Sequence, residues 1–153
     1  MAPVLLAIKS SYTTFKALMY LTILILSIVT LAGAAQSQST GVGKFNTLLS
    51  VAVFLAILAI PIMKLLPLEA LFSKLNIPED KHYLSFFGFV LALSVLIIIF
   101  AGQNKVTSDK ETTQNTNAKR AATGIAVLTT LMLVINHKLG LELNLDVTNM
   151  LPI

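Results

Sequence analysis

The chain contains a run of nineteen residues without a single charge, YLSFFGFVLALSVLIIIFA, at positions 83–101. As an α-helix this run is about 28 Å long, close to the thickness of the hydrocarbon core of a bilayer. Charged segments, PEDKH and GQNK, flank it on both sides. The run therefore predicts a membrane span, around which the other segments have to be arranged.

Three further apolar runs predict three further spans. They cover residues 17–35, residues 45–63 and residues 121–138. The first also has the basic flank and small residues of a signal peptide, but sixteen residues precede it, so we expect a retained span. The last is short and needs its final lysine to extend toward the membrane surface. The predicted fold is an all-α bundle of four transmembrane helices, in one integral-membrane domain over residues 1–153.

The segments between and beside the spans are more polar. Residues 1–16 suit either a helix on the membrane surface or a flanking turn of the first span, and residues 64–76 suit a second amphipathic, interfacial segment. Residues 102–120 are so polar that we expect a solvated loop. The tail, residues 139–153, alternates leucine with other residues as a strand does, yet its charges also recur at helical spacing. Its conformation stays open.

Composition restricts the function classes. Only 12% of the residues are charged, and there is no cysteine, which excludes disulfides and thiolate metal sites. The net charge of +4 suits contact with anionic lipids or an acidic partner. Because the basic residues are scattered along the chain, we do not expect nucleic-acid binding. The basic residues nearest the predicted membrane surfaces are the expected lipid-headgroup contacts: Lys9, Lys16, Lys64 and Lys138.

Ionisable residues are absent from the apolar cores of all four predicted spans. Such residues mark proton relays and ion pathways in membrane proteins, so their absence argues against a transporter or a voltage sensor. His82 lies beside two acids and His137 ends the last span, where a metal or a quinone headgroup could bind. An interfacial polar cap is the preferred interpretation of both. We predict no enzyme activity, no catalytic residue, no metal and no cofactor other than bound phospholipid.

Small residues four positions apart occur on three of the predicted spans. In lipid, such stripes allow two helix backbones to approach closely, where van der Waals contact drives association. The predicted helix-packing residues are Ala52, Ala56, Gly88, Ala92, Ala122, Ala126 and Thr130.

Between residues 54 and 140 the chain resembles the DoxX-type four-helix membrane proteins. The resemblance is carried by PIMKLLP, FSKLNIPED and KRAATGIAVLTTLMLVINHKLG. The positions that fit the family pattern are Lys64, Leu75–Pro78, Arg120 and His137. Pro61 replaces a glycine, the span at 83–101 lacks the expected acid, and an extra N-terminal span stands in place of the final one. The resemblance implies quinone or small-molecule binding near His137 and Lys138, whereas the missing acid argues against a redox role.

The four-span plan is also similar to MARVEL-type proteins, which implies a membrane organiser. Packing stripes without buried ionisable groups favour a third function, a non-catalytic structural or accessory subunit of a larger membrane protein complex. Its expected partners are other membrane subunits and anionic lipids. The first acidic residue is Glu69, and no glycosylation sequon occurs. We therefore expect an organelle inner membrane, that of the mitochondrion.

Overall fold

The structure is a computed structural model that describes residues 2–65, 73–76 and 82–139, with the side chains of residues 14–62, 73–76 and 83–138. Four long α-helices make up most of it: α1 (Ala2–Ala35), α2 (Gly41–Ala59), α4 (His82–Gln103) and α5 (Asp109–Leu139). A short 3₁₀-helix, η1 (Ile60–Leu65), continues α2. The described residues contain no strand.

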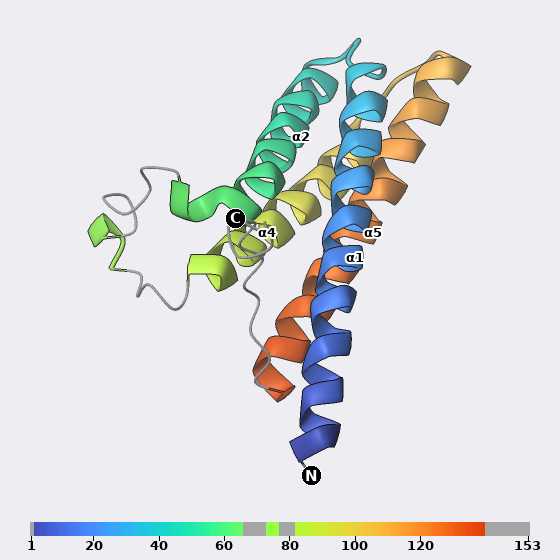
Figure 1. Cartoon of the computed structure of the whole chain (residues 1–153). Coiled ribbons are helices and arrows are strands. Elements are labelled where there is room, and N and C mark those ends of the chain that lie inside the picture. The colour runs from blue at the N-terminus through green and yellow to red at the C-terminus, as the bar shows by residue number, and fades with distance from the viewer. Residues whose placement is uncertain (1, 66–72, 77–81, 140–153) are drawn as a thin grey trace.

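The four helices form an up-down-up-down bundle (Figure 1). Each helix packs against its two neighbours in the order α1, α2, α4, α5 and back to α1, so every contacting pair is antiparallel. Four helical segments are long and apolar enough to cross a membrane, and the second extends from α2 into η1: Thr14–Ala35, Gly41–Ile62, Tyr83–Gln103 and Asp109–Lys138. The chain is therefore an all-α, multi-pass membrane protein, which confirms the predicted fold class.

The buried residues include, on each of the four helices, a series of positions three or four residues apart. This is the spacing with which helices pack nearly parallel or antiparallel in bundles. On α4 the buried positions are Phe87, Val90, Ser94, Ile97 and Ala101. On α2 they are Gly43, Asn46, Ser50, Val53 and Ile57, followed by Ile60 at the start of η1. On α5 they are Asn115, Ala118, Ala122, Ile125, Thr129 and Met132. On α1 they are Lys16, Met19, Ile23, Ser27, Thr30 and Ala34, and Ser37 continues the spacing in the connection to α2.

Large apolar side chains cover the outer faces of the same helices. Leu48 is 67% exposed, Ile25 60% and Val127 61%. In a bilayer these side chains face lipid or another apolar helix, so exposure here carries no hydrophobic penalty.

The polar segment 102–120 is not the solvated loop that its composition predicts. Asp109 to Arg120 are the first turns of α5, and residues 104–108 alone connect α4 to α5. Packing explains the difference, because Asn115 and Ala118 are buried against neighbouring helices. Tertiary contact supplies the helix stability that the polar sequence lacks.

The N-terminal residues 2–16 do not form a separate helix on the membrane surface, which was one of the two predictions for them. α1 runs without a break from Ala2 to Ala35, so residues 2–16 continue the axis of the span. Of the tail 139–153 the structure describes only residue 139, and of the interfacial segment 64–76 it describes residues 64–65, which end η1, and residues 73–76. Of the latter, residues 73–76 are exposed and end in Asn76, which has a positive φ of 57°.

A hydrogen bond from Tyr20 joins α1 to the C-terminal end of α2. Pro61 has no N–H, so the carbonyl of Ile57 loses the donor that a continuing α-helix would supply. The Tyr20 hydroxyl donates to this carbonyl at 2.8 Å, and the N–H of Ile60 also bonds to it. Pro61 therefore ends α2, and the Ile57 carbonyl still has hydrogen-bond donors.

Candidate functional site: the polar end of the bundle

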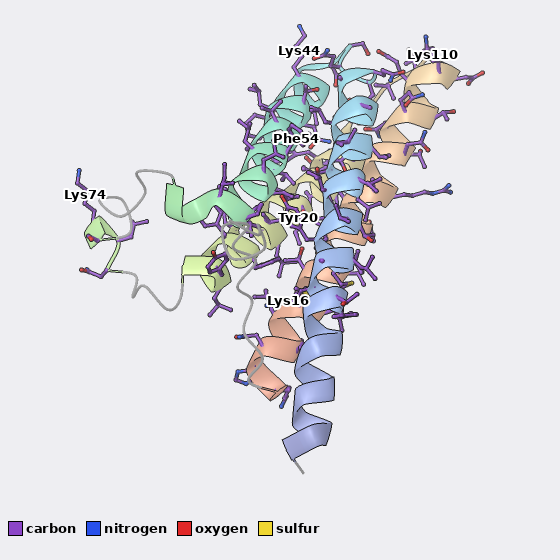
Figure 2. The ribbon with its side chains drawn as sticks, in the orientation of Figure 1. Lys16, Tyr20, Lys44, Phe54, Lys74 and Lys110 are labelled. Carbon is purple, nitrogen blue, oxygen red and sulfur yellow. The ribbon has the colours of Figure 1, made fainter. Side chains whose placement is uncertain are left out.

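Polar side chains gather where α1 meets α2 and where α4 meets α5. We call this region the polar end and define it by Ser37, Thr40, Asn104 and Asn115. Lys44 and Lys110 mark the same end of the molecule in Figure 2, whereas Lys16 and Tyr20 lie lower along α1. Both helix connections at this end are short, which brings the four residues together.

Two asparagines form the centre of the polar end. Asn104 is 8% exposed and Asn115 is 9% exposed. Asn104 Nδ2 donates to Asn115 Oδ1 at 3.1 Å and to the carbonyl of Ser37 at 2.9 Å. Asn115 Nδ2 donates in turn to the carbonyl of Ala101 at 2.8 Å. The pair thus joins the α1–α2 connection, the end of α4 and the first part of α5.

Thr40 extends this network into α2. As the N-cap of α2, its side chain accepts a hydrogen bond from the N–H of Gly43 at 2.9 Å, and its hydroxyl donates to Asn104 Oδ1. Gly43 can bear no side chain, because a Cβ there would collide with the Ser37 carbonyl and lie 2.8 Å from the Cα of Gln38. One exposed contact completes the end, with Ser39 Oγ donating to Glu111 Oε2 at 2.6 Å.

Gly33 allows α1 and α5 to approach closely just below the polar end. A Cβ on Gly33 would lie 2.6 Å from the carbonyl oxygen of Gln114 and 2.9 Å from the N of Ala118. Both are backbone atoms, which cannot move aside as a side chain can. Gly124 makes a softer contact further along α5, where the obstacle is the end of the Leu26 side chain.

The middle of the bundle contains buried hydroxyl groups as well as apolar side chains. Each of four such residues donates to a carbonyl of its own helix at 2.6–2.8 Å: Ser27, Thr30, Ser50 and Ser94. Asn46 Oδ1 and Thr129 Oγ1 are buried and have no hydrogen-bond partner among the described residues. Asn46 Nδ2 makes one long contact of 3.5 Å with the Ile97 carbonyl.

The predicted packing residues are divided between inner and outer faces. Ala56 and Ala122 are buried in the main apolar cluster, and Ala52 and Ala126 are half-buried. Gly88 was predicted to pack against another helix, but a Cβ there would meet nothing within 4 Å, so no helix of this chain approaches it closely. Ala92 and Thr130 are exposed. Larger residues such as Phe87 and Val90 turn α4 so that its small-residue stripe faces outward.

The predicted lipid-contact lysines differ in their surroundings. Lys138 is exposed at the end of α5, beside the exposed His137. Lys16 is only 8% exposed and lies on the buried face of α1, so it is not the open headgroup contact that its position in the sequence predicts. The side chains of Lys9 and Lys64, and of His82, lie outside the described residues.

The polar end was not predicted, although the sequence holds a signal for it. Small and polar residues follow the three-four spacing at 27, 30, 34 and 37, and again at 43, 46 and 50. Interior faces in membrane bundles are marked by small and polar residues and not by hydrophobicity. The same residues can hold helices together, whereas no three His, Asp or Glu side chains gather as a metal site in the described part.

Comparison of the chain with models of known protein families, with curated proteins and with solved structures gives no match.

Proposed function

We propose that this chain is a non-catalytic structural or accessory subunit of a larger membrane protein complex. One observation carries the proposal. The bundle uses its interior polar groups to join helices, through Asn104 and Asn115 at the polar end and Tyr20 near the middle. The sequence holds no acid, Lys, Arg or His between residues 17 and 35, 45 and 62, 83 and 101, or 121 and 136. Lys16, at the lower end of the α1 span, is the one buried charged residue among the described side chains. A single buried cation without a chain of further ionisable groups suits a rigid strut better than a pathway for ions or protons.

The outer surface supports the same proposal. Exposed leucine, isoleucine and valine side chains cover the helices, and the stripe of Gly88 and Ala92 lies open on α4. A small-residue stripe without a partner inside the chain is the type of surface on which a helix of another membrane subunit packs. Phospholipid covers the remaining apolar surface.

Native purification tests this proposal. The tagged full chain is extracted from its membrane in a mild detergent, with a tagged multi-pass protein of the same membrane as control. We expect the chain to migrate with a larger complex and to carry a constant set of membrane proteins that the control lacks. A lone, monodisperse species of 16.5 kDa would contradict the proposal.

The proposed location is the inner membrane of the mitochondrion. Its support is the acid-free sequence before Glu69, together with the lack of cysteine and of glycosylation sequons. Fractionation of cells that express the tagged chain tests it, with enrichment expected in inner-membrane vesicles. Enrichment in plasma-membrane or secretory vesicles would instead favour a MARVEL-like organiser.

A further inference from the structure

Two adjacent basic residues, Lys119 and Arg120, lie on the outer face of α5. Both are exposed, whereas Ala118, Ala121 and Ala122 around them are buried. Because α5 is continuous from Asp109 onward, the pair lies about 15 Å along the helix from its start. The two charges are therefore not at the tip of the bundle.

Hydrogen bonds between helices fix the depth of this pair. Asn115 is level with Ala101 of the antiparallel α4, because Asn115 Nδ2 donates to the Ala101 carbonyl. Lys119 and Arg120 come one turn later and are thus level with the region of Ile97. Apolar side chains nearer the polar end remain exposed on α2 and α4, with Phe45 and Ile99 each 47% exposed. Phe45 also packs edge-on against Phe100, with ring centroids 5.2 Å apart. The basic pair therefore lies deeper than this apolar rim.

The chain supplies no counterion for the pair on any of the four helices. α1, α2 and α4 contain no Asp or Glu. The acids of α5 are Asp109 and Glu111, which are eight or more residues away along the helix, and Glu111 accepts a hydrogen bond from Ser39. Exposed cations at membrane depth without a carboxylate need an anion from outside these four helices.

The outer face of α5 changes character just beyond the pair. Thr116 and Thr123 lie one turn to either side, so their hydroxyls share this face. Further toward the opposite end, Val127 is 61% exposed, Leu131 42% and Val134 48%. These residues follow one another at the same three-four spacing and form an apolar stripe about 10 Å long, which ends about 20 Å below the charges. Basic groups above an apolar stripe match a lipid, with its phosphate at one end and its acyl chains at the other.

We propose that Lys119 and Arg120 form a binding site for the phosphate of an anionic phospholipid whose acyl chain lies along Val127, Leu131 and Val134. The guanidinium of Arg120 offers a planar fork that suits phosphate oxygens, and Lys119 adds a second charge. Free phosphate shares the headgroup chemistry, but it would leave the apolar stripe unused. The site is independent of the accessory role, because it needs lipid alone and no partner protein.

Native mass spectrometry of the full chain in detergent tests the site. The chain is titrated with phosphatidylglycerol or with phosphatidylcholine of the same acyl chains. We expect it to retain phosphatidylglycerol at a several-fold lower lipid concentration, since each basic residue near a membrane surface contributes about fivefold in affinity. In the double variant K119Q/R120Q this preference is expected to fall to within twofold of unity. Equal retention of the two lipids by the unmodified chain would overturn the proposal.

The matched control is Lys110→Gln, which removes an exposed lysine from the same helix beside Asp109 and Glu111. It should leave the lipid preference unchanged, and an equal loss there would show nonspecific attraction and overturn the proposal. Arg120→Lys keeps the charge and the fold and should retain part of the preference, so a folding defect in the double variant would not decide the result.

Two further measurements separate the possible sources of the anion. Millimolar inorganic phosphate should not displace phosphatidylglycerol, and displacement would show a free-phosphate site instead. A photoreactive residue in place of Thr123 should couple to lipid in native membranes. Coupling mainly to an acidic segment of another protein would overturn the lipid assignment.

Discussion

Asn104 donates from Nδ2 to Oδ1 of Asn115 at 3.1 Å, across the connection that joins α4 to α5. Both residues are at least nine-tenths buried, although their sequence surroundings are among the most polar in the chain. The pair holds the first part of α5 against the bundle. The stability of this polar half of α5 therefore depends on tertiary contacts.

Replacing Asn104 with alanine should destabilise the bundle. The change leaves the Ser37 carbonyl and Asn115 Oδ1 without their donor, and a buried unpaired group costs about 1–3 kcal/mol. Denaturant titration of helicity by circular dichroism measures the loss. Asn117→Ala, at an exposed site on α5, is the control and should change the free energy of unfolding by less than about 0.5 kcal/mol. Equal effects of the two substitutions would disprove the structural role of the asparagine pair.

Gly33→Ala should force α1 away from α5. The new methyl group would lie 2.6 Å from the Gln114 carbonyl oxygen, and overpacking of this kind costs about 1–3 kcal/mol. Gly88→Ala adds the same methyl group where nothing lies within 4 Å, and its higher helix propensity should add up to about 1 kcal/mol. Thermal unfolding followed by circular dichroism compares the two variants. A Gly33→Ala protein that melts at the temperature of the unmodified chain would contradict this packing.

The hydrogen bond from Tyr20 should depend on Pro61. Tyr20→Phe removes the hydroxyl that serves the Ile57 carbonyl, and we expect a loss of about 1 kcal/mol in the free energy of unfolding. In a Pro61→Ala background, the alanine N–H can take over this carbonyl, so the loss should shrink to less than half. A double-mutant cycle of the four proteins measures the coupling. Strict additivity would show that the tyrosine does not compensate for the proline.

The four-span topology predicts which connections share a side of the membrane. Because the chain has no cysteine, single cysteines can be introduced and labelled without background. Gln38→Cys and Thr107→Cys, both at exposed sites in connections at the polar end, should react with an impermeant maleimide from the same side of sealed vesicles. Ser73→Cys, on the connection between α2 and α4, should react from the other side. Labelling of Gln38→Cys and Thr107→Cys from opposite sides would exclude this topology.

The number of spans and their approximate positions could be predicted from the sequence. The reason is solvation: hydrocarbon cannot hydrogen-bond the backbone, so each crossing needs an apolar helix of about twenty residues. Residues 83–101 meet this requirement without help from any other part of the chain, and α4 (His82–Gln103) contains them.

The inward faces and the extent of the polar half of α5 were decided by tertiary structure. Lipid and protein interior are both apolar, so no hydrophobic pattern distinguishes Gly88, which faces outward, from Ala122, which is buried. The rotation of each helix depends on the side chains of its two neighbours. Residues 109–120 are likewise too polar to predict as a packed helix. They form a packed helix because Asn115 donates a hydrogen bond to α4 and Ala118 packs against Gly33 of α1. Solvation thus set the spans, whereas contacts between residues distant in the chain set the packing.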